Sequence, residues 1–186
     1  MLTPHPLNAI HDGWPVLASF SVLLVLFLLI GNRTKGRLLT PEAPRRAVSL
    51  ELAGTEERAE QIINSWAREG MIGEAYRHLR WDAFLIPVYS TLWALGCVIA
   101  ARAFFGRGTT AYDVALAVAW LPWLAGVLDY VENGAMYGML DGFDGETLPR
   151  RAWWCAAVKF AIIIPLGVYS LAGVACYAWK WFRGVL

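Results

Sequence analysis

The sequence predicts an all-α integral membrane protein, a four-transmembrane-helix bundle with a cytoplasmic amphipathic helix between spans 1 and 2. Hydrophobic residues make up 58% of its 186 residues, and the mean hydropathy of +0.45 exceeds that of a soluble domain with a charged surface. Four largely apolar runs have about the 20 residues that a helix needs to cross a bilayer. Lys and Arg are concentrated on one side of these runs, as positive charge is in membrane proteins.

The four spans are expected within a single membrane domain of residues 1–186, at about 15–31, 83–101, 114–140 and 152–179. The first run resembles a signal peptide in length, but no Lys or Arg precedes it. A basic cluster follows it instead, formed by Arg33, Lys35 and Arg37. This polarity predicts a membrane anchor with its N-terminus outside and not a cleaved leader.

The orientation follows from the Lys and Arg residues outside the spans, because cytoplasmic loops retain positive charge. Nine lie in residues 32–80, and Arg150 and Arg151 lie in the loop before the last span. The opposite side has four, two between the second and third spans and two after the fourth. We therefore expect a multi-pass protein of the cytoplasmic (plasma or inner) membrane with both termini outside.

The loop between the first two spans carries the predicted cytoplasmic helical segment, about residues 55–80. Thr55 is a suitable N-cap, and Glu56 and Glu57 follow it at the positive end of the helix dipole. One face of this helix is apolar, with Ala59, Ile62, Ile63 and Trp66. Two placements stay open for that face, the inner membrane surface and the mouth of the bundle.

The same helical segment has one expected interruption. Gly70 offers a stop for the first helix. From Ile72 a second helix is expected to continue into span 2, because no helix breaker separates Glu74 from Asp82.

Ionisable residues within the spans are the main functional signal, since a charge at the bilayer centre costs at least about 2.5 kcal/mol. Asp129 and Glu132 are three residues apart on span 3 and share a helix face. Lys159 lies eight residues after Arg151, about two turns into span 4. Asp82 starts span 2 at its inner end. All four fall in the predicted cytoplasmic half, so we expect one polar cluster.

The candidate ligand- or proton-binding residues are these charged groups and two neutral neighbours, namely Asp82, Tyr89, Asp129, Glu132, Asn133 and Lys159. Three carboxylates against one lysine leave an excess of negative charge, which a proton, a bound cation or a cationic ligand would relieve. The alternative is an interhelical ion pair that only fixes packing. A metal site that also includes His78 is a weaker alternative, because one histidine with carboxylates is poor evidence for metal binding.

Absent motifs limit the chemistry. The sequence has no P-loop, GxSxG, HExxH, zinc-type CxxC pair or in-span histidine for haem, so we expect no cofactor and no metal site, and catalytic residues stay unknown. Cys97, Cys155 and Cys176 are interpreted as small apolar residues without a disulfide framework. The near-neutral net charge of +1 does not favour nucleic acid.

Three functions remain as hypotheses. The first is binding of a small or amphiphilic ligand, with possible coupling to a proton. The second is a scaffold or subunit of a membrane complex, using the amphipathic helix and the GxxxG pair of Gly134 and Gly138, which permits close approach within the chain or in a homo-oligomer. The third is an intramembrane enzyme that modifies lipids with Asp129 or Glu132 as general acid or base. Membrane lipids, a second copy or another membrane protein are the expected partners.

Overall fold

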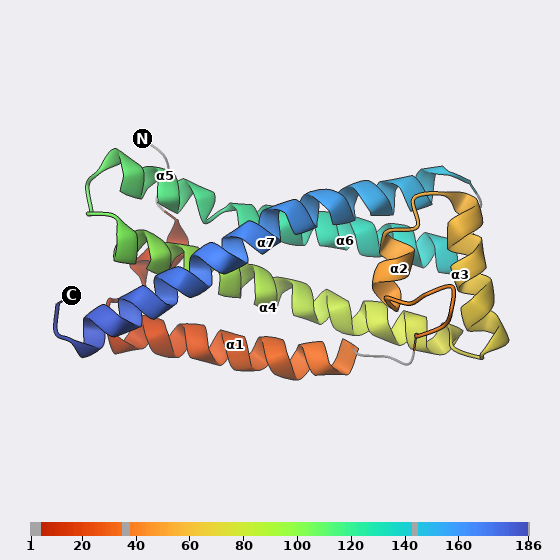
Figure 1. Ribbon diagram of the computed structural model, residues 1–186, viewed down its shortest axis with the longest axis horizontal. Helices are drawn as coiled ribbons and strands as arrows, with labels where there is room; N and C mark the ends of the chain where they lie inside the picture. Colours follow the sequence, from red (N-terminus) through yellow and green to blue (C-terminus); the bar gives the residue numbers. More distant parts are fainter. Residues whose placement is uncertain (1–4, 35–37, 143–144, 186) are drawn as a thin grey trace. The chain divides into compact units, whose positions relative to one another are not determined.

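The computed structural model describes residues 5–34, 38–142 and 145–185, and all regular elements within these residues are helices (Figure 1). Four stretches are long and apolar enough to cross a membrane: Trp14–Asn32, Ile72–Phe104, Thr110–Leu140 and Thr147–Phe182. They hold helices α1 (Trp14–Thr34), α4 (Ile72–Phe104), α5 (Thr110–Val118), α6 (Leu121–Leu140) and α7 (Thr147–Phe182). The predicted helical class is thus confirmed for the described residues.

Three shorter helices complete the described chain, namely η1 (Pro6–Ala9), α2 (Ala47–Glu51) and α3 (Glu56–Arg68). The side chain of Thr55 accepts a hydrogen bond from the Arg58 N–H at the start of α3, which confirms the predicted cap. Gly70 adopts a φ of +67° between α3 and α4, a conformation that suits glycine at a helix end. Lys35 and Arg37 of the predicted basic cluster lie outside the described residues.

Helix α4 begins at Ile72 and continues to Phe104, as the absence of a helix breaker predicted. It contains Pro87, whose carbonyl accepts a hydrogen bond from Thr91 Oγ1 at 2.7 Å. The hydroxyl thus bonds a carbonyl one turn away within the proline-containing helix. The two helices expected within residues 55–80 are therefore separate: α3 ends at Arg68, and α4 begins at Ile72 and is continuous with the predicted span 2.

The predicted span at 114–140 is divided into two helices. Helix α5 ends at Val118, and α6 begins at Leu121, with Ala119 and Trp120 in a turn between them. Pro122 explains the break, because proline has no N–H for the i−4 carbonyl and fits the first turn of a new helix. The helix is therefore fully interrupted at this point of the predicted span.

The chain separates into two compact units. Unit 1 comprises Met1–Phe27, Pro87–Ala125 and Ala161–Leu186, and unit 2 comprises Leu28–Ile86 and Gly126–Phe160. Helices α1, α4, α6 and α7 each contribute residues to both units.

Close helix packing in unit 1 depends on two glycines. A Cβ added to Gly173 on α7 would lie 2.1 Å from the Cβ of Ala100 on α4. A Cβ added to Gly96 on α4 would lie 2.6 Å from the Cβ of Ser170 on α7. By contrast, a Cβ at Gly134 would meet nothing within 4 Å. The close approach that small residues permit within the chain therefore occurs at Gly96 and Gly173, and not at the Gly134 of the GxxxG pair.

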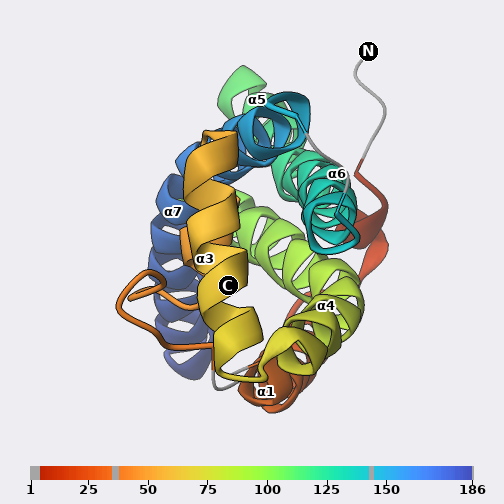
Figure 2. The ribbon, with the colours of Figure 1, turned by 90° about the vertical axis from the view of Figure 1, so that its right-hand side faces the viewer.

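The core of unit 2 is built around α3, which lies across α4, α6 and α7 of this unit (Figure 2). Ile62 and Trp66 are fully buried, and Trp66 Nε1 donates a hydrogen bond to the Leu38 carbonyl at 3.1 Å. Their partners from the other helices include Leu79, Met136 and Ala152. Ile62 and Trp66 on the apolar face of α3 are therefore buried within unit 2, and the position of α3 at the mouth of a membrane bundle stays a prediction.

Candidate functional site

Lys159 is the centre of a buried cluster of charged side chains in unit 2. Its Nζ donates hydrogen bonds to Asp129 Oδ1 at 2.7 Å and to Glu132 Oε1 at 3.0 Å, and lies 2.9 Å from Glu132 Oε2. Its Nζ also lies 3.7 Å from Glu51 Oε2. We call these four residues the Lys159 cluster. The contacts of Lys159 with Asp129 and Glu132 confirm the predicted gathering of these three groups.

Three elements position the Lys159 cluster. Asp129 and Glu132 lie about one turn apart on α6 and therefore face the same direction. Lys159 extends from α7, and Glu51 is the last residue of α2. The long lysine side chain reaches both acids on α6, so a single ammonium group joins two helices and the short loop helix.

All four members of the Lys159 cluster are removed from solvent. Glu132 is 0% exposed, Asp129 4%, Lys159 7% and Glu51 8%. A buried charge is costly unless it is paired, and one ammonium compensates only one of the three carboxylates. The cluster would carry two excess negative charges if every acid were ionised, which favours a proton on at least one of them.

Two buried carboxylate oxygens near Lys159 indicate where such a proton would be favoured. Glu132 Oε2 is paired with the Lys159 ammonium at 2.9 Å, whereas Glu51 Oε2 is buried, lies 3.7 Å from that ammonium and accepts no hydrogen bond within the described part of the chain. Leaving a buried acceptor unsatisfied costs about 1–3 kcal/mol, and more when it is charged. A proton on Glu51 or Glu132 would remove one of the negative charges that the single ammonium does not compensate.

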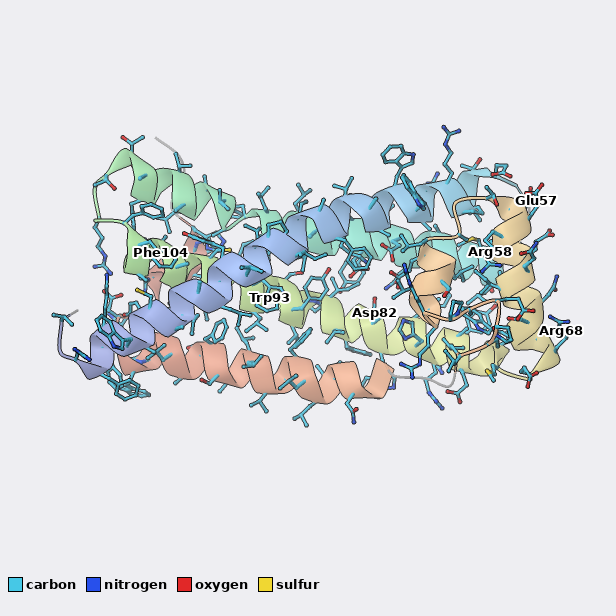
Figure 3. The ribbon with its side chains drawn as sticks, viewed as in Figure 1. Glu57, Arg58, Arg68, Asp82, Trp93 and Phe104 are labelled. Atoms are coloured by element: carbon cyan, nitrogen blue, oxygen red, sulfur yellow. The ribbon has the colours of Figure 1, made fainter. Side chains whose placement is uncertain are left out.

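Asp82 and Asn133 form a polar pair beside the Lys159 cluster. Asn133 Nδ2 donates a hydrogen bond to Asp82 Oδ2 at 2.8 Å, and Asn133 follows Glu132 directly on α6. Asp82 is half-buried on α4 (Figure 3). The structure therefore links Asp82 to the neighbourhood of the cluster through an amide.

Two further predicted residues lie on α4. Tyr89 is buried there, and its membership of the site stays a prediction. His78 lies one turn before Asp82 on α4 and is half-buried. Among the described residues, no three His, Cys, Asp or Glu side chains are grouped so that they could hold a metal ion. The four residues of the Lys159 cluster thus offer lysine and carboxylate chemistry.

Glu51 is a member of the cluster that the sequence prediction missed, because it lies in the loop between spans 1 and 2. One signal was available in the sequence. Glu51 stands alone between Leu50 and Leu52, in a short apolar stretch that forms α2. An isolated acid in such a stretch often has a buried partner, since an unpaired carboxylate there would be costly.

Known proteins provide no function for this arrangement. The chain matches no protein-family model, no curated protein and no solved structure. The chemistry of the cluster is therefore the basis on which a function is inferred.

Proposed function

We propose that the chain is a multi-pass protein of the cytoplasmic membrane whose Lys159 cluster holds an exchangeable proton. We further propose that a small or amphiphilic cationic ligand displaces this proton. The observation that carries the proposal is the excess of three buried carboxylates over one ammonium, with distances of 2.7 to 3.7 Å from Nζ. In the proposed orientation both termini lie outside and the cluster lies in the inner half of the membrane.

The close contacts in the cluster support a proton as the resident species. Lys159 touches Asp129 and Glu132 directly, so a proton can be held without moving any side chain. A larger cation would have to separate these side chains. Its positive charge would then neutralise the carboxylate that had carried the proton. Binding of the cation and release of the proton are linked in this way.

Other charged and titratable groups near the cluster set its charge balance. Asp82 and His78 lie on α4, and Cys155 lies one turn before Lys159 on α7. Asp82 adds a further acid on the side of Asn133. The negative excess therefore does not depend on one carboxylate alone.

The other two hypotheses have less support. A scaffold function through Ile62 and Trp66 conflicts with the burial of both side chains in the core of unit 2. Catalysis on lipids would need Asp129 or Glu132 to reach a substrate, and both are almost completely buried against Lys159.

The experiment measures proton release from the purified full chain in weakly buffered detergent with a pH-indicator dye. Tetraphenylphosphonium serves as the lipophilic cation. Wild type should release a proton on addition of this cation, whereas folded Asp129→Asn and Glu132→Gln should release much less.

Glu57→Gln removes an exposed acid from α3 and should behave as wild type (Figure 3). Absence of release from wild type would contradict the proposal. Variants that only fail to fold would assign the cluster to packing.

A further inference from the structure

Unit 1 contains a second polar site, separate from the Lys159 cluster. A cavity of about 500 Å³ is lined by Asp12, Gly13, Arg102, Arg107, Tyr177 and Trp181. This volume falls within the range of about 300–1,000 Å³ that small-molecule sites usually have. Two guanidinium groups, one carboxylate, one phenol and one indole thus meet around one cavity, which we call the arginine cavity.

Arg102 is built firmly into the wall of the arginine cavity. Its side chain is 3% exposed, although it carries a charge. Its Nη2 donates hydrogen bonds to the carbonyls of Asn8 and Ile10 at 2.9 and 3.0 Å, and also to Asn8 Oδ1 at 3.2 Å. Buried arginine is uncommon without such partners. The N-terminal segment therefore holds this guanidinium in one orientation.

Asp12 neutralises only part of the positive charge in the cavity. Its Oδ1 lies 3.0 Å from Arg102 Nη1 and accepts a hydrogen bond from the Tyr177 hydroxyl at 3.3 Å. Its Oδ2 accepts a hydrogen bond from Arg107. The Tyr177 hydroxyl also accepts a hydrogen bond from the Gly13 N–H at 2.8 Å. Both oxygens of one carboxylate are thus engaged, and two guanidinium groups leave one net positive charge.

We propose that the arginine cavity binds the phosphodiester group of a phospholipid. A phosphodiester carries one negative charge and several acceptor oxygens, which match one net positive charge and the planar donor groups of arginine. This inference rests on the proposed membrane insertion, because a lipid ligand requires a bilayer around the helices.

Aromatic residues beside the cavity favour a lipid over a soluble anion. Trp181 lines the cavity, and Phe182 follows it at the end of α7 with 79% of its surface exposed. Trp14 follows Gly13 at the start of α1 and is 68% exposed. Trp side chains prefer the level of the lipid head groups, where one side of the ring is apolar and the other is wet. Apolar surface next to a cationic cavity fits a ligand with acyl chains and a phosphodiester.

Native mass spectrometry of the full chain in neutral detergent can test this site with defined probes. The lipid probe is dioleoyl phosphatidylglycerol, whose only charge is its phosphodiester, and dioleoylglycerol is the matched lipid without phosphate. Inorganic phosphate is added as a competitor. Wild type should bind the phospholipid in preference to dioleoylglycerol, and an equal concentration of inorganic phosphate should not displace it.

The test variant is Arg107→Gln, because the Arg107 side chain is 63% exposed and its loss should leave the fold intact. Loss of a charge-assisted hydrogen bond should weaken phospholipid binding about tenfold or more. Arg183→Gln removes an exposed cation near the same end of α7 that does not line the cavity, and should change binding less than twofold.

Two results would overturn the inference. Equal weakening by Arg107→Gln and Arg183→Gln would show that only the general positive charge of the surface matters. Equally tight binding of dioleoylglycerol, or displacement of the phospholipid by inorganic phosphate, would show that the cavity does not recognise a lipid phosphodiester.

Discussion

Lys159 Nζ lies 2.7 Å from Asp129 Oδ1 and 2.9 Å from Glu132 Oε2, so one ammonium bridges two acids about one turn apart on α6. With Glu51 as a third acid, the charges do not cancel. This imbalance distinguishes the site from a simple buried ion pair, in which one positive group matches one negative group.

Lys159→Met should strongly destabilise the protein. The substitution leaves three buried carboxylates without a cation, and removal of one partner of a buried pair typically costs about 3–5 kcal/mol. The control Arg68→Met breaks the exposed Glu42 pair and should cost at most about 1 kcal/mol. Thermal unfolding in detergent measures both. Similar stability of Lys159→Met and wild type would show that the acids do not depend on this ammonium.

His5 should make unit 1 less stable in acid. Burial against the rings of Trp120 and Trp123 lowers the pKa of the His5 imidazole from its usual 6.5. Below about pH 6.5 the unfolded chain therefore binds a proton that the folded chain resists, and stability falls as the pH falls. Above that pH the contribution of His5 is fully present.

The variant His5→Phe keeps an aromatic ring at this position but cannot titrate. Its melting temperature should fall less than that of wild type between neutral and mildly acidic pH. Equal decreases in both proteins would show that other groups cause the acid sensitivity.

Gly173→Ala should destabilise unit 1, because the new Cβ would lie 2.1 Å from the Cβ of Ala100. Overpacking of this kind typically costs about 1–3 kcal/mol. Gly134→Ala is the matched control, since its Cβ would meet nothing within 4 Å and the helix would gain up to about 1 kcal/mol. Melting temperatures that change equally in both variants would refute the close approach of α4 and α7.

Trp66→Ala should lower the stability of unit 2 by about 3–5 kcal/mol, the usual cost of removing a large buried aromatic ring. The exposed Arg68 lies two residues further along α3 (Figure 3), and Arg68→Ala should have little effect. Unfolding curves of both variants provide the comparison. If Trp66→Ala keeps the stability of wild type, the apolar face of α3 does not form a core.

The sequence was sufficient for the features that depend on local patterns. Four apolar helices, the Thr55 cap and the continuity of α4 from Ile72 follow from composition and residue spacing. The contact of Asp129 and Glu132 with Lys159 followed from their common depth, which loop charges and helical rise together predicted.

Features that depend on tertiary packing could not be predicted from local sequence patterns. Glu51 joins the cluster because the tertiary packing of unit 2 places the end of the loop helix α2 beside Lys159, and no periodicity specifies that position. Gly96 and Gly173, where an added Cβ would collide with the neighbouring helix in unit 1, have no motif spacing that distinguishes them.

Infrared spectroscopy of the carboxylic acid C=O stretch most directly tests the proton in the Lys159 cluster. At neutral pH the folded wild type should show a protonated carboxyl band, and the double variant Glu51→Gln/Glu132→Gln should lose it. Glu57→Gln/Glu69→Gln removes two exposed acids from the same unit and should keep the band. A wild-type spectrum without a protonated carboxyl, or a band that persists in Glu51→Gln/Glu132→Gln, would contradict the account.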